Sequence, residues 1–236
     1  MFPSNIFLKK SYFRLTMLIA GIDDAGRGPV IGPMVIAIAA MEEAKLKELK
    51  KLGVKDSKLL SPKRRETLSK KIKQIAKTEF VLVHPKEIDR YLSTPGTNIN
   101  MLEAEKMAFL ISKIKPDKAI IDCPSTNTKK FKELIERLIN NKCTIIAEHK
   151  ADLRFPIVSA ASIIAKVVRD GEIDKIKKEI GYDFGSGYSS DPRTVKFLKE
   201  YWRTHHNIFR KEWISYKMVK EKASQLTLSR FFEEND

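Results

Sequence analysis

The chain has 236 residues, enough to bury a large core without disulfide bonds. Lysine and arginine outnumber aspartate and glutamate by 45 to 30; the net charge of +15 favours a nucleic acid as partner, with a generally basic surface as the alternative. Cys123 and Cys143 lack C-x-x-C spacing, so we expect neither a disulfide framework nor a zinc knuckle. No apolar run is long enough to cross a bilayer or to form a secretory signal, so we expect a cytoplasmic location.

Strands and helices alternate along the chain from residue 17 onward. Residues 17–22 and 30–41 are apolar and favour two strands, with acids at the point where the first strand ends. Ser61 is a good N-cap for a helix that begins at Pro62. The other expected elements are helices at 42–52, 62–77, 101–113, 128–141, 160–179 and 192–206, and strands at 80–84, 118–122 and 143–148. This alternation predicts an α/β sheet whose strand ends collect Asp23, Asp24, Asp122 and Asp152.

Two adjacent acids stand out in the segment Gly21-Ile22-Asp23-Asp24-Ala25-Gly26-Arg27-Gly28. Neighbouring residues of a regular strand point to opposite faces, so both carboxylates reach one site only if the strand bends after Asp23. The two glycines after the acids make such a bend plausible and allow a ligand to approach the backbone. Taken alone, the pattern also fits an Asp-Asp turn that closes a strand.

Together with later segments, this octapeptide resembles ribonuclease HII, the type 2 ribonuclease H family, and most closely its archaeal members. The later segments follow in the family's order: Val54-Lys55-Asp56-Ser57-Lys58, Ile120-Ile121-Asp122 leading into Ser125-Thr126-Asn127-Thr128, Ala147-Glu148-His149-Lys150-Ala151-Asp152, and Gly185-Ser186-Gly187-Tyr188-Ser189-Ser190-Asp191-Pro192. The resemblance runs from about residue 17 to residue 217. It implies a ribonuclease H-like fold, in which a central mixed five-stranded sheet is flanked by helices and followed by a C-terminal helical section.

The resemblance also divides the chain into four parts. Residues 1–16 are expected to be an N-terminal extension, either a misassigned start or a disordered arm. Residues 17–205 are expected to form the ribonuclease H-like catalytic domain, residues 206–222 the C-terminal helical section, and residues 223–236 a tail.

Carried over residue by residue, the family motifs imply that four carboxylates bind metal and carry catalysis: Asp23, Asp24, Asp122 and Asp152. Two Mg²⁺ or Mn²⁺ ions are expected, because these hard cations prefer oxygen ligands and the chain has no histidine or cysteine cluster. The family usually has Asp-Glu where this chain has Asp23-Asp24, which shortens the second acid by about 1.5 Å. The alternative to an active enzyme is therefore a catalytically weakened protein that binds RNA/DNA hybrids.

The implied activity is hydrolysis of RNA in RNA/DNA hybrids and cleavage on the 5′ side of ribonucleotides embedded in duplex DNA. This reaction serves ribonucleotide excision repair and primer removal, and leaves 3′-hydroxyl and 5′-phosphate ends. The expected substrate contacts are Gly26, Arg27 and Gly28 at the 2′-hydroxyl and nearby phosphates, Lys58 at a phosphate, and Tyr188 on the following sugar. An integrase or resolvase of the same broad fold is disfavoured by the glycine-arginine-glycine turn and the Tyr188 segment.

The tail carries the segment Gln225-Leu226-Thr227-Leu228-Ser229-Arg230-Phe231-Phe232, which looks like a sliding-clamp binding box. Such a peptide makes one short helical turn that inserts Leu228, Phe231 and Phe232 into an apolar pocket, while Gln225 hydrogen-bonds beside it. The alternative is a tail that folds back onto its own domain. The family further suggests a monomer that binds RNA/DNA hybrid, ribonucleotide-containing duplex DNA and the DNA sliding clamp.

Overall fold

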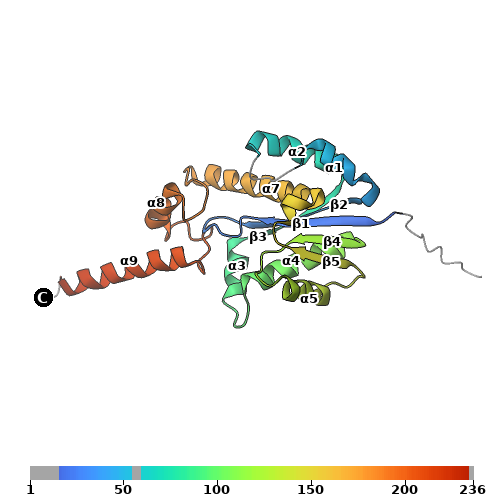
Figure 1. Ribbon diagram of the computed structural model, residues 1–236. Helices are drawn as coiled ribbons and strands as arrows, with labels where there is room; N and C mark the ends of the chain where they lie inside the picture. The colour runs from blue at the N-terminus through green and yellow to red at the C-terminus, as the bar shows by residue number, and fades with distance from the viewer. Residues whose placement is uncertain (1–15, 55–59, 234–236) are drawn as a thin grey trace, which may run out of the picture.

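The computed structural model describes residues 16–54 and 60–233, with side chains as far as Gln225. Within these residues a five-stranded sheet is covered by helices on both faces (Figure 1). The strands are β1 (Leu18–Ala25), β2 (Met34–Glu42), β3 (Lys77–Val83), β4 (Lys118–Asp122) and β5 (Thr144–Glu148). The helices are α1 (Leu46–Leu52), α2 (Pro62–Ile75), α3 (Pro85–Leu92), α4 (Ile99–Ile114), α5 (Thr128–Leu138), α6 (Ala151–Arg154), α7 (Pro156–Ile180), α8 (Pro192–Tyr201) and α9 (Ile214–Glu233), and a 3-10 turn, Glu43–Lys45, precedes α1.

The sheet is mixed, with the strand order β3-β2-β1-β4-β5. Strands β1, β2 and β3 pair antiparallel, whereas β4 pairs parallel with β1 and β5 pairs parallel with β4. The parallel register sets Ile22 beside Ile121, so the next residues, Asp23 and Asp122, lie at the same end of neighbouring strands. The predicted mixed five-stranded α/β sheet is confirmed, and its topology brings residues from distant parts of the chain to one edge.

Helices α1, α2 and α7 cover one face of the sheet, and α3, α4 and α5 cover the other (Figure 1). Strand β2 contributes to both cores: Ile36 and Ile38 pack on the side of α4, and Val35 and Ala37 pack on the side of α7. Because both faces are covered, β2 reads as a continuous apolar run and not as an alternating pattern.

Helix α7 lies against β1 at Gly21. A Cβ atom built on Gly21 would lie 2.3 Å from the backbone carbonyl of Ile157, so only glycine fits beneath the first turn of the helix. Ala160, Ala161 and Ser162, all buried, continue this close contact. Because α7 lies so close to Gly21, the helix runs beside the end of β1 that carries Asp23.

The C-terminal section packs on the loop that follows β1. The core at this contact is half aromatic and includes residues of the loop, of α7 and of α8; it is formed by Val30, Ile31, Ile173, Phe184, Phe197, Leu198, Phe209 and Tyr216. Ile31 forms an isolated antiparallel bridge with Phe209. Helix α9 then projects away from the body (Figure 1). Among the described residues, no helix combines the length and apolarity needed to span a membrane.

The structure differs from the expected elements mainly at the ends of strands and in short helices. Strand β1 does not end at Ile22; it continues to Ala25, because Asp23 and Asp24 stay paired with Ala37 and Ile36 of β2. Helix α7 begins at Pro156 instead of residue 160, and α8 ends at Tyr201 instead of residue 206. Helices α3 and α6 are not predicted, because so few residues give too weak a helical period.

Other expectations are confirmed. Strand β4 has the predicted bounds, Lys118–Asp122. The Ser61 side chain caps α2, accepting a hydrogen bond from the backbone N–H of Arg64 at 3.3 Å. A proline at the first helical position and a hydroxyl acceptor just before it thus define the start of this helix as expected.

The contact at Gly21 predicts a large loss of stability for Gly21→Ala. The added methyl group must displace the backbone of α7, and we expect the free energy of unfolding in urea to fall by at least about 2 kcal/mol. Gly171→Ala is the matched control. Gly171 lies on α7, the helix that packs on Gly21, and nothing lies within 4 Å of its Cβ position, so this change should raise the free energy of unfolding by about 0.5–1 kcal/mol. Equal stability of the two variants would contradict the close approach.

Candidate active site

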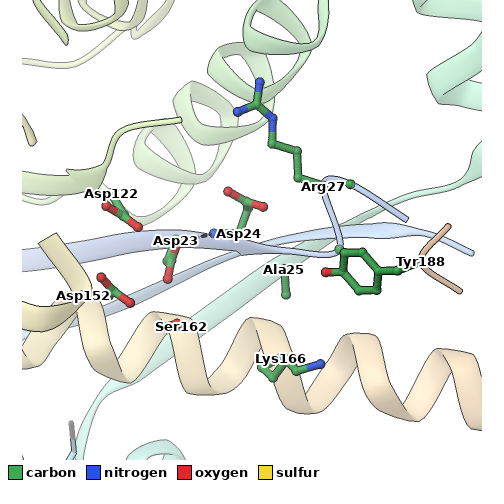
Figure 2. A pocket seen from close by; sticks show the side chains of 11 residues that line it. Asp23, Asp24, Ala25, Arg27, Asp122, Asp152, Ser162, Lys166 and Tyr188 are labelled. Carbon is green, nitrogen blue, oxygen red and sulfur yellow. Dashed lines mark hydrogen bonds between the residues drawn. The ribbon is translucent and has the colours of Figure 1, made fainter. Parts of the chain in front are cut away.

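Three carboxylates meet at the end of the central strands. Asp23 comes from β1, Asp122 is the last residue of β4, and Asp152 lies in α6. One oxygen from each of the three lies within 4.8 Å of the others. Asp23 and Asp152 are buried and Asp122 is half-buried. Figure 2 shows the three side chains pointing toward one another.

Hydrogen bonds hold these carboxylates in place. The backbone N–H of Ala151 donates to Asp122 Oδ1 at 3.0 Å, and the N–H of Asp24 donates to Asp23 Oδ1 at 2.7 Å. The Ser162 side chain on α7 also hydrogen-bonds Asp23. Before α6 the chain turns through Lys150, whose φ of 56° is left-handed, and this turn carries Asp152 back toward the sheet. The cluster is therefore preorganised by neighbouring strands and helices.

The charged form of Asp23 is unfavourable in this cluster. Burial raises the pKa of Asp23 well above its ordinary value, and the nearby charges of Asp24 and Asp122 raise it further. A bound cation would remove this penalty, and a donor set made only of carboxylate oxygens suits a hard divalent ion. The residues present therefore fit a metal site.

Asp24 does not belong to this cluster. Strand β1 remains paired with β2 through Ala25, so it does not bend after Asp23 and the two side chains point to opposite faces. Figure 2 shows Asp24 directed away from Asp152. Three of the four predicted carboxylates are grouped, and Asp24 lies outside the group but lines the same cavity, so its role as a metal ligand stays a prediction.

A cavity of about 310 Å³ opens beside the three grouped acids. It is lined by Asp23, Asp24, Ala25, Gly26, Arg27, Gly28, Asp122, Asp152, Ser162, Lys166 and Tyr188. The structure therefore brings the acids, the glycine-arginine-glycine turn and Tyr188 to one hollow, although the sequence separates them widely. Lys58 lies outside the described residues.

Tyr188 stands over the turn. Its side chain is 36% exposed, and its ring lies 3.5 Å from the position that a Cβ atom would take on Gly28. The guanidinium carbon of Arg169 lies 5.4 Å from the ring centroid, and Arg169 Nη2 donates to the Ser186 carbonyl at 2.6 Å. The Tyr188 ring is therefore supported by a cation-π contact with Arg169 and lines the cavity.

The Arg27 side chain points away from the acids (Figure 2). Its Nε lies 3.2 Å from Glu103 Oε1, and its two terminal nitrogens donate to Asn100 Oδ1 and the Pro124 carbonyl at 2.7 and 2.9 Å. The guanidinium thus contacts protein groups in this structure, and the phosphate contact predicted for Arg27 stays a prediction.

Sequence reasoning missed several residues of the site. Lys166 lines the cavity and donates to Asp170 Oδ1 at 2.6 Å, one turn away on α7. Glu103 is fully buried beside Arg27, and burial, followed by the charge of Asp24, raises its pKa to about 8. The SAASIIAK run of α7, small residues leading to a lysine, is a signal for a helix lying close to a site. No signal distinguishes Glu103 from the other acids of α4.

Comparisons with known proteins agree with this geometry. A sequence model of the family described as Ribonuclease HII matches residues 20–216. The chain is 48% identical over 227 residues to a ribonuclease HII of Pyrococcus furiosus, covering 92% of this chain and 99% of that one. The ribonuclease H2 structure from Pyrococcus horikoshii OT3 superposes with a TM-score of 0.80 at 45% identity, over 87% of this chain and 98% of that one. This likeness confirms the ribonuclease H-like fold.

A second solved structure is that of the PCNA:RNase HII complex from Archaeoglobus fulgidus. It matches with a TM-score of 0.75 at 43% identity, covering 84% of this chain and 95% of that chain.

The raised pKa of Asp23 makes Asp23→Asn a test of the site's electrostatics. Because the folded-state pKa is raised, the stability that protonated Asp23 contributes is lost as the pH rises through that pKa. In metal-free buffer at pH 7, the variant should melt at least about 2 °C above the wild type, and the gap should narrow toward pH 4. Asp174→Asn removes an exposed acid of α7 and should change little. A lower melting temperature for Asp23→Asn would contradict the electrostatic account.

Proposed function

The chain belongs to the ribonuclease HII family and is a ribonuclease H, and on this premise we propose that it cuts 5′ of ribonucleotides embedded in duplex DNA as well as hydrolysing RNA in RNA/DNA hybrids. The products carry 3′-hydroxyl and 5′-phosphate ends, and the enzyme acts as a cytoplasmic monomer in ribonucleotide excision repair and primer removal. The observation that carries the proposal is one cavity lined by grouped acids, a glycine-rich turn and Tyr188.

Asp23, Asp122 and Asp152 are the residues that would hold metal, and we assign them two Mg²⁺ or Mn²⁺ ions. When bound, such ions lower the pKa of a water nucleophile and neutralise charge on the reacting phosphate. The protein's own part is to hold the three carboxylates at fixed spacing through Ala151, Ser162 and the strand register. Lys166 adds a cationic group at the cavity wall, where it can attract a phosphate of the substrate strand.

Substrate choice requires a group that detects the 2′-hydroxyl, because this group alone distinguishes the ribonucleotide from its DNA neighbours. The backbone of Gly26, Arg27 and Gly28 lines the cavity and is suited to this reading. A side chain at residue 28 would contact the Tyr188 ring, so glycine keeps the space between turn and ring open for a sugar. Tyr188 then stacks on the sugar of the following nucleotide.

The position of Asp24 favours a second candidate function. Its carboxylate lies outside the metal-binding group, and the family usually has the longer Glu at this position. A protein that binds ribonucleotide-containing duplexes but turns over slowly would keep the turn and Tyr188 while losing rate. Cleavage measurements distinguish the two functions.

The proposed activity is tested with a duplex that contains one ribonucleotide. With Mg²⁺ or Mn²⁺, we expect a single nick on its 5′ side and no cleavage of the same duplex made only of DNA, because only the former carries the 2′-hydroxyl that the turn reads. The ends are identified by ligation and by electrophoresis beside marker strands. Asp122→Asn serves as the inactive control. Comparable cutting of the all-DNA duplex would refute the assignment.

Asp24→Glu should raise metal-dependent cleavage. The added methylene extends the carboxylate by about 1.5 Å, and about 1 Å of misplacement in such a site can cost about a hundredfold, so we expect kcat to rise about tenfold or more. Asp174→Glu makes the same change at an exposed position of α7 and should leave kcat unchanged. Equal or lower kcat in Asp24→Glu would show that the shorter acid does not limit turnover.

We also propose that the segment from Gln225 to Phe232 binds the DNA sliding clamp. The PCNA complex of the Archaeoglobus fulgidus relative supports this partner. Helix α9 runs without a break from Ile214 to Glu233 and projects from the body, which places the segment where a second protein can reach it (Figure 1). In place of one isolated turn after residue 222, the segment continues a long helix; the side chains of Leu228, Phe231 and Phe232 lie outside the described part.

Removing residues 225–236 should abolish clamp binding and leave cleavage of short duplexes unchanged, because the described residues that line the cavity all precede residue 225. Titration calorimetry with the purified clamp and the nicking assay measure the two effects. Lys220→Ala alters the exposed surface of the same helix outside the segment and should bind the clamp normally. Unchanged clamp affinity after the deletion would dispose of this proposal.

A further inference from the structure

Two side chains from the segment between α8 and α9 hold the glycine-arginine-glycine turn from behind. Arg210 Nη2 donates to the Gly26 carbonyl at 2.6 Å, and Arg210 Nη1 donates to the Arg27 carbonyl at 2.7 Å. Trp213 Nε1 donates to the Gly28 carbonyl at 3.0 Å. Three successive carbonyl oxygens of the turn thus have their partners in the C-terminal section.

These contacts fix the direction of the N–H groups. In a planar trans peptide the carbonyl of one residue and the N–H of the next point in opposite directions. The N–H groups of Arg27 and Gly28 therefore point away from Arg210, while the carbonyl of Gly28 precedes Pro29, which has no N–H. Within the described residues, neither N–H donates a hydrogen bond to another protein group.

The lining of the cavity indicates that it lies on the side to which these N–H groups point. Gly26, Arg27 and Gly28 line it, whereas Arg210 is fully buried and does not. Two unoccupied backbone donors on adjacent residues suit the oxygen of a hydroxyl group, which accepts two hydrogen bonds.

Burying the charged Arg210 side chain to donate hydrogen bonds to carbonyls costs free energy. Burial, together with the nearby charge of Arg169, lowers its pKa to about 9. In the described structure the hydrogen bonds of its guanidinium go to the carbonyls of Gly26, Arg27 and Gly32, and the guanidinium stacks on Trp213 with 4.9 Å to the ring centroid. Three separate nitrogens of one planar group each donate to a different carbonyl here, whereas a lysine ammonium carries all its donors on a single nitrogen.

The backbone locks the same segment to the turn. Arg210 N–H donates to the Val30 carbonyl at 2.8 Å, and Gly32 N–H donates to the Ile208 carbonyl at 2.9 Å. Gly26 has a φ of +78°, and a Cβ atom there would lie 2.9 Å from the Pro33 carbonyl oxygen. The turn is therefore confined on several sides and has little freedom to rotate its peptides.

We propose that Arg210 and Trp213 are positioning residues for ribonucleotide recognition, which hold the N–H groups of Arg27 and Gly28 toward the 2′-hydroxyl. This inference rests on the proposed function and deepens it, because it makes the C-terminal section part of the substrate-reading site. A deoxyribonucleotide leaves both donors unpaired, so the preference for a ribonucleotide depends on the fixed direction of the two peptides.

Binding measured without metal tests this inference apart from catalysis. Fluorescence anisotropy in EDTA gives the affinities for a duplex with one ribonucleotide and for the same duplex in DNA alone. We expect the wild type to prefer the first by about tenfold, the value of one well-placed hydrogen bond. Arg210→Lys should bring this ratio close to one while leaving the affinity for the DNA duplex within about twofold, and Trp213→Phe should lower the ratio about threefold. Arg203→Lys, an exposed arginine near the end of α8, should keep the wild-type ratio.

The ratio separates positioning from general damage, because a loosened fold weakens both duplexes alike. A folded Arg210→Lys protein, checked by circular dichroism and melting, that keeps the wild-type ratio overturns the inference. If Arg210→Lys does not fold, Trp213→Phe decides in the same way, and an unchanged ratio there overturns it. A wild type with no preference refutes the proposed substrate reading itself, and with it the inference that rests on that reading.

Discussion

The burial of the Asp23 carboxylate beside the charges of Asp24 and Asp122, where β1 and β4 end, is the constraint on which the site depends. The parallel register of these strands sets Asp23 beside Asp122, and the left-handed turn at Lys150 returns Asp152 to them. Gly21 lets α7 lie directly on β1, so that Ser162 reaches Asp23. The fold keeps like charges together at a cost in stability, and a bound divalent cation offsets that cost. Stability of the metal-free chain and metal-dependent activity are thus opposite consequences of one arrangement.

Strand β1 directs its two adjacent acids to opposite faces of the sheet, and the turn after it lines the cavity. Asp23 faces the acids and α7, whereas Asp24 faces Glu103 and Arg27 on the side of α4. The next residues, Gly26 to Gly28, leave the sheet and present backbone to the cavity, with Arg210 and Trp213 behind them. The C-terminal section therefore supports the turn that lines the cavity, and it also leads into the helix proposed to bind the clamp. The proposed substrate-reading turn and the proposed metal site therefore share a few consecutive residues of one segment.

Much of this arrangement could be predicted from the sequence, and the rest depends on contacts that no local pattern records. The bounds of β4 and the cap at Ser61 follow from short-range rules, and the family motifs pointed to Asp122 and Asp152. The face on which Asp24 lies could not be predicted, because pairing with β2 keeps β1 straight where the glycines allowed a bend. Arg210 in sequence is one of many basic residues; only the fold shows that it is buried against carbonyls far away along the chain.

The claim that the grouped acids form the metal site is tested most directly by anomalous diffraction from crystals of this protein soaked in Mn²⁺. The account predicts anomalous density within coordination distance, about 2.0–2.3 Å, of oxygens of Asp23 and Asp122, with Asp152 beside it. Density bound only elsewhere on the protein, or none at a saturating concentration of Mn²⁺, would contradict it.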